Sequence, residues 1–399
     1  MLLSIGALII ELHPLRFSTV QALTLIVEAA LLLVSGATTN NAIDDRNSSV
    51  REILEEQIRA SRYPGIQYVV TDSAGVVFEY DGGMADIAHG APMTPGTTMM
   101  AYSMTKTYTA VAVLQLIERG QVNLDDSVTA YLDYVPYGRA LTVRSLLAQM
   151  SGIPNPIPLR WAHAAEIHAS FSEDAALRRV LSENPELKFP PGTRYAYSNI
   201  SYWLLGKVVE KVSGRRFPSY MADNIFGPLG LSPQEAAFTI VGGGAHAKGY
   251  LKKYSWLNIF KGFLVDESLI GDYEGSWLSI RDHYLNGPAF GGLIATARAV
   301  ARFLRDQLRE HSVLLSPATT KLFYAQQRTI SGEPVPMTLG WHIGDLSGTP
   351  YYYKEGGGGG FHSEMRLYPS RHIGTVIMVN ETSSSCTDTQ DELDAEFVR

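Results

Sequence analysis

The sequence predicts a mixed α/β fold of the α+β type, in which one mainly antiparallel sheet, built from both ends of the chain, carries an inserted helical region. Residues 65–83 read as two strands joined by a short turn. Residues 101 to about 310 are mostly helical in pattern, and residues 349–381 return to β-rich runs. Because the connections between neighbouring strands are short, we expect antiparallel pairs and a single domain with an appended helical subdomain.

The predicted domain spans residues 49–399. Its α/β part comprises about 49–100 and 290–399, and its helical part about 101–289. A helix, SVREILEEQIRAS, opens the domain directly after the polar stretch NNAIDDRNSSV, which is predicted to be a linker. At the other end, TPYYYKEGG, GFHSEMRLYP and HIGTVIMVNE read as three successive strands.

The N-terminal segment, residues 1–48, is hydrophobic and resembles a signal peptide or an anchor. Met1–Ile10 is almost wholly apolar, and Leu23–Val34 has the length of a signal-peptide core. Small residues follow at Ser35 and Ala37, where a signal peptidase would cleave. We therefore expect a periplasmic, secreted or membrane-anchored protein, with a packed N-terminal helix or a wrongly assigned start as the alternative.

Composition and charge exclude some functions. The net charge is −7 over 399 residues, and no basic block stands out, so nucleic acid is not an expected partner. The chain has one cysteine, Cys386, which rules out an intrachain disulfide and is expected to be structurally incidental. His163 and His168 lie five residues apart without a nearby acidic triad, so neither a metal nor another cofactor is expected.

A serine and a lysine stand three residues apart at the start of a predicted helix. Apolar residues recur at Val111, Leu114 and Ile117 along this helix. Ser103 and Lys106 precede this stripe and share one helical face. A serine needs a base to act as a nucleophile, and a buried lysine with a lowered pKa can be that base.

Two further motifs follow in the order known for Ser-x-x-Lys enzymes. Tyr197-Ser198-Asn199 lies in a loop just before an apolar helix. Lys354-Glu355-Gly356 lies at the end of a predicted strand and takes the place of a Lys-Thr-Gly motif. The three elements together are far more specific than Ser-x-x-Lys alone, which arises by chance in chains of this length.

With these motifs, the sequence resembles the serine β-lactamase and penicillin-recognising superfamily from about Ser49 to Glu381. It is nearest the branch of class C β-lactamases, D-alanyl-D-alanine carboxypeptidases and related family VIII-type carboxylesterases. The phrases that also carry the resemblance are LTVRSLLAQMSGIPN, FPPGTRYAYSN, IFGPLGL, GGLIATARAVARFL and GGFHSEMRLYP. The resemblance implies a mainly antiparallel sheet flanked by helices, with an all-helical subdomain.

The resemblance also implies a role for each motif residue. Ser103 would be the nucleophile, and Lys106 and Tyr197 its general bases. Asn199 would hydrogen-bond both the lysine and the substrate. Lys354 would lower neighbouring pKa values and attract a carboxylate.

The glycines of the third motif complete the site that the resemblance implies. Gly356 would belong to the substrate-binding strand, and the backbone N–H groups of Ser103 and Gly357 would form the oxyanion hole. On elementary chemistry, Tyr197 can act as a base only beside cations such as Lys106 and Lys354, which lower its pKa.

One departure from the family pattern bears on the substrate. Glu355 replaces the usual threonine, and an acid beside Lys354 would weaken attraction for an anionic substrate. This favours a neutral ester. Aromatic residues between about Ala236 and Pro288 could line an acyl or alcohol pocket, although packing in the helical subdomain is the expectation.

The function predicted from sequence is that of a serine hydrolase, which cleaves esters or amides through a covalent acyl-enzyme. The alternatives are a β-lactamase or D-alanyl-D-alanine carboxypeptidase, and a non-catalytic sensor that binds β-lactams or peptidoglycan. The absence of a Gly-x-Ser-x-Gly elbow argues against an α/β-hydrolase. His362 follows the glycine run and is not expected to be catalytic.

Overall fold

The computed structural model describes residues 43–156, 161–242, 245–259, 261 and 266–398. The predicted signal or anchor segment therefore lies almost wholly outside the described residues. A single helix occupies residues 43–59, so most of the stretch predicted to be a linker is helical instead. Acidic residues at its start, Asp44 and Asp45, favour the first turn of a helix. The fold described below is that of the unit Ile53–Arg399.

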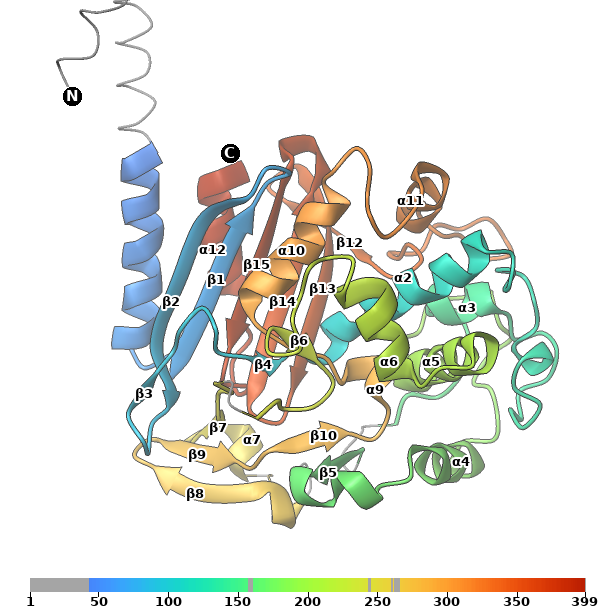
Figure 1. The fold of residues 1–399 in the computed structure, drawn as a ribbon, viewed down its shortest axis with the longest axis horizontal. Helices are drawn as coiled ribbons and strands as arrows, with labels where there is room; N and C mark the ends of the chain where they lie inside the picture. The colour runs from blue at the N-terminus through green and yellow to red at the C-terminus, as the bar shows by residue number, and fades with distance from the viewer. Residues whose placement is uncertain (1–42, 157–160, 243–244, 260, 262–265, 399) are drawn as a thin grey trace, which may run out of the picture. The chain divides into compact units, whose positions relative to one another are not determined.

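One seven-stranded sheet forms the centre of this unit, in the order β12-β13-β14-β15-β1-β2-β3. Every neighbouring pair is antiparallel. Figure 1 shows blue N-terminal strands in one sheet with red C-terminal strands. The strands are β1 (Gly65–Thr71), β2 (Val76–Asp86), β3 (Ala91–Pro92), β12 (His342–Leu346), β13 (Thr349–Gly358), β14 (Phe361–Tyr368) and β15 (Ile373–Val379). The predicted sheet from both chain ends is confirmed, and β3 and β12 are additions to it.

Helices cover both faces of the sheet, and adjacent residues of β1 show which helix lies on which face. The side chain of Gln67 accepts a hydrogen bond from the first residue of α10 (Ala297–Gln307). The side chain of Tyr68 donates one to Asp394 in α12 (Thr387–Val398). Because side chains alternate along a strand, α10 and α12 pack on opposite faces.

The inserted region is less helical than predicted. It contains the expected helices and short helical turns, but also strands that form three small sheets. The helical segments are η1 (Tyr102–Met104), α2 (Thr105–Glu118), η2 (Val128–Ala130), α3 (Val143–Leu147), η3 (Ala165–Ser170), α4 (Glu173–Glu183), α5 (Asn199–Ser213), α6 (Phe217–Met221), η4 (Ala222–Phe226), α7 (Trp256–Ile259), η5 (Glu267–Leu269) and α9 (Pro288–Gly291). Beyond it lie α11 (Pro317–Tyr324) and η6 (Pro369–Arg371).

The small sheets correct the prediction of an all-helical subdomain. Their strands are β4 (Met99–Met100), β5 (Ala162–Ala164), β6 (Ala236–Ala237), β7 (Gly249–Lys252), β8 (Ile270–Glu274), β9 (Trp277–Ile280), β10 (His283–Leu285) and β11 (Ile294–Ala295). Most of them are too short to show a clear alternating pattern, so helical periodicity dominates the sequence between residues 101 and 289.

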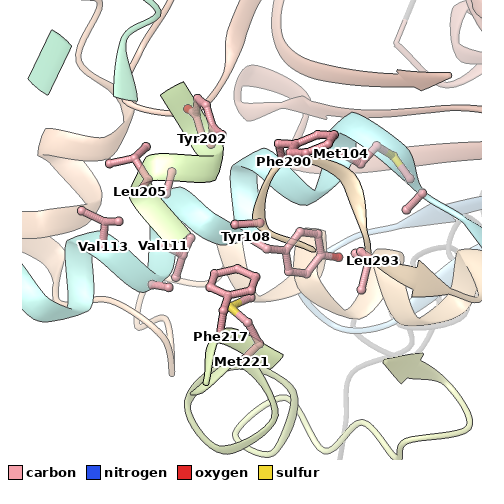
Figure 2. Close-up of a cluster of buried hydrophobic side chains, with 14 of the residues drawn as sticks. Met104, Tyr108, Val111, Val113, Tyr202, Leu205, Phe217, Met221, Phe290 and Leu293 are labelled. Carbon is pink, nitrogen blue, oxygen red and sulfur yellow. The ribbon is translucent and has the colours of Figure 1, made fainter. Parts of the chain in front are cut away.

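The helix α2 runs through the middle of the core. Figure 2 shows it surrounded by apolar side chains from α5, α6 and α9, among them Leu205, Phe217 and Phe290. All residues of α2 from Thr105 to Leu116 are buried. Its buried threonines donate to backbone carbonyls, as Thr109 does to Ala289 at 2.7 Å, so their burial leaves the hydroxyls satisfied. This helix, buried from Thr105 to Leu116, supports the residues at its N-terminus.

None of the helices in the described ranges combines the length and the hydropathy needed to cross a bilayer.

The aromatic side chains of the segment after β7 differ from the prediction. Tyr254 is 88% and Trp256 is 62% exposed, so they neither line a pocket nor pack in a core. Trp277, on β9, is buried as expected.

Candidate active site

Ser103 lies in the single helical turn η1, which leads directly into α2. The residue before it, Tyr102, has a φ of 43°, a left-handed backbone conformation that is strained for an aromatic residue. Its hydroxyl lies 2.9 Å from His283 Nε2 and 3.2 Å from the carbonyl oxygen of Gly359. The side chain of the strained residue is thus anchored by two contacts, directly before the predicted nucleophile.

Two side chains from different parts of the chain reach the hydroxyl of Ser103. Lys106 Nζ lies 2.9 Å from Ser103 Oγ, one helical turn along the chain. The phenol of Tyr197, in the loop before α5, lies 2.7 Å from the same oxygen. The structure therefore brings together the three residues that the sequence predicted to be catalytic, in the arrangement of a nucleophile with its proton acceptors or donors.

The amine of Lys106 is fully buried and, in addition to its contact with Ser103, has two fixed acceptors. It donates to Asn199 Oδ1 at 2.7 Å and to the backbone carbonyl of Phe290 at 2.6 Å. Burial, together with the positive charge of Lys354, holds the pKa of Lys106 well below its usual value. A neutral amine has two hydrogens, so donating both to these carbonyl oxygens leaves its lone pair for the proton of Ser103. The geometry is that of a general base.

Tyr197 differs from the sequence expectation. Lys106 Nζ and Lys354 Nζ lie 4.9 Å and 5.2 Å from the centre of its ring. Burial nevertheless dominates and raises the pKa of Tyr197, with smaller upward contributions from Tyr195 and Glu355. In the resting site the phenol is therefore protonated and donates its hydrogen bond to Ser103, instead of being a base ready to act.

Lys354 lies on β13 and is fully buried, and its amine has no hydrogen-bond partner within the described part of the chain. Burial lowers the pKa of Lys354 to about 7, although the charge of Glu355 opposes this shift. The pKa of His342 also lies far below its usual value. The main cause is the burial of the ring, and the positive charges of Lys354 and Lys106 lower this pKa further. An unpaired buried amine is costly, so this position is suited to an acceptor that a substrate supplies.

The glycines of β13 allow the strand to approach Ser103 closely. A Cβ atom on Gly356 would lie 2.2 Å from the carbonyl oxygen of Ala101 and 2.9 Å from the backbone nitrogen of Ser103. A side chain at this position would thus collide with the turn that holds Ser103. The next residue, Gly357, lines the same cavity as Ser103.

Ser103 opens onto a cavity of about 240 Å³, whereas Lys106 and Tyr197 are not among its described lining residues. Ser103, Asn199 and Gly357 lie on its wall, together with His283. Most of the remaining wall is apolar and is made by Ala162, Leu251, Leu257, Leu269, Ile280, Leu285 and Phe290. Asp266 contributes an acidic side chain to the described part of the wall, and it accepts hydrogen bonds from Ser268. The cavity therefore presents a mainly aliphatic surface beside Ser103.

Glu355 does not face this cavity, which corrects the substrate argument made from sequence. Lys354 and Gly356 point to the side of Ser103, so the side chain of Glu355 projects from the opposite face of β13. There its carboxylate accepts a hydrogen bond from His362 Nε2 at 2.7 Å. Its charge raises the pKa of Lys354.

Two other sequence predictions concern histidines and the cysteine. His362 contacts the buried Cys386, with 2.9 Å between Nδ1 and Sγ, so the cysteine is not incidental.

His163 and His168 stack on each other and share a hydrogen bond of 2.9 Å. They lie beside a larger cavity of about 650 Å³, which Ser103 does not line. In the described ranges, no group of three or more His, Cys, Asp or Glu residues could hold a metal ion.

Some residues of the site were missed in the sequence. The contribution of Phe290 comes from a backbone carbonyl, which every residue has, so no sequence signal marks it. His342 lies outside the three motifs, and its Nε2 is 3.2 Å from the hydroxyl of Tyr195. Tyr102 stands directly before Ser103, and only its backbone conformation distinguishes it.

Comparison with protein families gives a match that covers most of the chain. A family model described as Beta-lactamase matches residues 50–399. Protein flp of Staphylococcus aureus strain MW2 is 27% identical over 191 residues, which are 47% of this chain. The matched region spans only 37% of the length of that relative. A putative D-alanyl-D-alanine carboxypeptidase of Escherichia coli O157:H7 is 24% identical over 87% of this chain and 85% of that protein.

Solved structures share the fold at low sequence identity. The D-amino acid amidase from Ochrobactrum anthropi SV3 has a TM-score of 0.73 at 18% identity, over 88% of this chain and 98% of that one. A penicillin-binding protein from Bacillus halodurans has a TM-score of 0.68 at 23% identity, over 87% and 99%. These likenesses confirm the predicted fold class of a sheet with flanking helices.

Proposed function

Because this chain belongs to the beta-lactamase family, we propose that it is a serine hydrolase that cleaves esters or amides through an acyl-enzyme on Ser103. The observation that carries the proposal is the pair of contacts at Ser103 Oγ. Lys106 Nζ lies at 2.9 Å and the phenol of Tyr197 at 2.7 Å. One group can accept the proton of the nucleophile while the other can donate one to a leaving group.

In the proposed acylation, the lone pair of Lys106 takes the proton of Ser103 as Oγ attacks the substrate carbonyl carbon. The carbonyl oxygen becomes an anion, which accepts hydrogen bonds from the backbone N–H groups of Ser103 and Gly357. When the intermediate collapses, the bond to the leaving oxygen or nitrogen breaks. The phenol of Tyr197 gives its proton to that leaving atom and recovers a proton from Lys106.

Deacylation uses the same groups in the reverse direction. A water molecule attacks the acyl carbon, and the Lys106–Tyr197 pair takes its proton. The bond from the acyl carbon to Ser103 Oγ then breaks, and Oγ regains a proton as the acid is released. Asn199 holds one hydrogen of Lys106 through both steps, so that the lone pair stays directed at Ser103.

The apolar wall beside Ser103 favours a substrate with an aliphatic or aromatic acyl group and no charge on it. Each methylene group of the substrate that is buried against this wall gains about 0.8 kcal/mol. A carboxylate in this part of the substrate would meet the acidic side chain of Asp266. Neutral esters are therefore the first substrate class proposed.

A second candidate is a D-alanyl-D-alanine carboxypeptidase or β-lactamase. The observation that favours it is the buried amine of Lys354, which lacks a hydrogen-bond partner among the described residues and could receive a substrate carboxylate. The similarity to a putative D-alanyl-D-alanine carboxypeptidase points the same way. A non-catalytic sensor is a third candidate, and the proton-transfer groups assembled around Ser103 disfavour it.

Export of the protein remains a prediction from the N-terminal segment.

The test compares three substrates with and without Ser103→Ala: a chromogenic short-chain ester, a chromogenic cephalosporin and a D-Ala-D-Ala peptide. We expect ester turnover in the wild type and a loss of about a thousandfold or more in the variant. Mass spectrometry after treatment with a fluorophosphonate should place the adduct on Ser103. Turnover that survives Ser103→Ala, or an adduct on another residue, would contradict the acyl-enzyme.

A further inference from the structure

A chain of three polar side chains lies behind β13, on the face opposite to Ser103. The carboxylate of Glu355 is 2.7 Å from His362 Nε2, and His362 Nδ1 is 2.9 Å from Cys386 Sγ. The backbone N–H of Cys386 also donates to His362 Nδ1, at 3.3 Å. Cys386 directly precedes α12. The chain therefore connects β13, β14 and the start of this helix.

These contacts fix the proton positions on His362. Because a backbone N–H can only donate, His362 Nδ1 must accept the hydrogen bond from Cys386 and carries no proton in the neutral ring. The proton of the imidazole is then on Nε2, where it is donated to Glu355. This charge-assisted hydrogen bond is the largest cause that lowers the pKa of Glu355. The imidazole is thus held in one orientation.

The held imidazole lies against Gly357. A Cβ atom on Gly357 would be 2.9 Å from His362 Cδ2, and the two residues face each other in the register of β13 and β14. Gly357 belongs to a run of five glycines, Gly356–Gly360. Glycine loses more conformational freedom on folding than any other residue, so the geometry of this run must be imposed by its surroundings.

The order carboxylate, imidazole, thiol is also that of a cysteine nucleophile with its base, but the surroundings exclude that role here. Cys386 is completely buried, and burial raises the pKa of its thiol well above the usual value. A nucleophilic cysteine needs the opposite environment. The three side chains are better suited to holding the backbone in front of them.

We propose that Glu355, His362 and Cys386 form a clamp behind β13 that positions the backbone N–H of Gly357 for oxyanion binding. The three are positioning residues, since none of them faces the cavity. The inference rests on the proposed function and deepens it, because it assigns a role to the glutamate that replaces the usual threonine of the motif. Substrate binding in the ground state depends little on this N–H, whereas the transition state depends on it strongly.

The clamp is tested by steady-state kinetics of Glu355→Ala and His362→Phe on one neutral ester. We expect kcat to fall roughly tenfold in each, with KM changed by less than about twofold, because a displaced oxyanion donor weakens mainly the transition state. The inhibition constant of a boronic acid that forms a tetrahedral adduct with Ser103 should rise by the same factor. Glu355→Gln, which still accepts from His362 Nε2, should keep most of the activity.

A double variant and a matched control separate positioning from general loss of stability. Glu355→Ala combined with His362→Phe should lose no more activity than either single variant, because both break the same chain. Thr375→Val removes a buried hydrogen bond to Asp394 on the same face of the sheet, away from the glycine run. It should lower the melting temperature and leave kcat unchanged.

Two results would overturn the clamp. One is an unchanged kcat in Glu355→Ala. Because the side chain of Glu355 is partly exposed, a loss of kcat in this variant is not explained by misfolding. The other is a kcat loss in Thr375→Val as large as that in the clamp variants. The proposed function fails separately, through turnover that survives Ser103→Ala. An active wild type with unaffected clamp variants would therefore contradict the clamp alone.

Discussion

Lys106 and Asn199 come from different helices, and the lysine amine donates to the asparagine side-chain oxygen at 2.7 Å. This contact determines where the lone pair of the neutral amine points. A second carbonyl, that of Phe290 at 2.6 Å, takes the other hydrogen. The amine of Lys106, the proposed base, is therefore oriented by two acceptors, neither of which adds a negative charge that would hold the lysine protonated.

Asn199→Asp keeps the shape of this contact and adds a charge. A carboxylate beside Lys106 should raise its pKa, so that the neutral amine forms only at higher pH. We expect the acidic limb of the pH profile of kcat to move upward by at least about one unit, with kcat at neutral pH reduced roughly tenfold. Asn199→Ala, which adds no charge, serves as the control and should not move the limb in this direction. An unshifted limb in Asn199→Asp would contradict Lys106 as the base.

Lys354→Met tests the second cation. Removing its charge should raise the pKa of Lys106, because the charge of Lys354 helps to lower that pKa in the wild type. The same variant should weaken substrates with a carboxylate more than neutral esters. In the wild type, kcat/KM for the carboxylate substrate should decline relative to that for the neutral ester as the pH rises through about 7, where Lys354 loses its proton. Measurement of kcat/KM from mildly acidic to mildly basic pH checks both expectations, and parallel profiles for the two substrates would contradict the second.

Glu355→Thr restores the usual family residue and tests the corrected substrate argument. From sequence, the change should favour anionic substrates roughly tenfold, the equivalent of about 1.4 kcal/mol. Because Glu355 faces His362 and supports the charge of Lys354, we now expect no gain for an anionic β-lactam relative to a neutral ester. The ratio of the two kcat/KM values is the measurement. A tenfold gain would show that Glu355 acts in the cavity after all.

Gly356→Ala should abolish activity. Its Cβ atom would lie 2.2 Å from the carbonyl oxygen of Ala101, so that β13 or the turn containing Ser103 must move. A displacement of about 1 Å at a reacting group costs about a hundredfold in rate, and the loss should be at least that large. Gly75→Ala is the matched control, since its Cβ atom would meet nothing within 4 Å. Activity close to wild type in Gly356→Ala would contradict the close approach of β13 to Ser103.

The strands at both chain ends could be predicted from the sequence, because short turns and β-rich runs are local signals. The three motifs could be predicted too, since Ser103 and Lys106 lie one helical turn apart and Tyr197 and Asn199 share one tripeptide. Their meeting in space is a tertiary property, because α2, the loop before α5 and β13 come together only when the core forms around α2.

The charge states and the directions of the side chains depend on tertiary packing. Burial keeps Tyr197 protonated although two lysines lie close to its ring, and burial depends on every element around it. The direction of Glu355 follows from strand register, since a shift by one residue exchanges the two faces of a strand. Pairing of β13 with β14 places this carboxylate against His362 and the amine of Lys354 on the side of Ser103. The sequence identifies the candidate residues, and the packing of the sheet sets what each of them contacts.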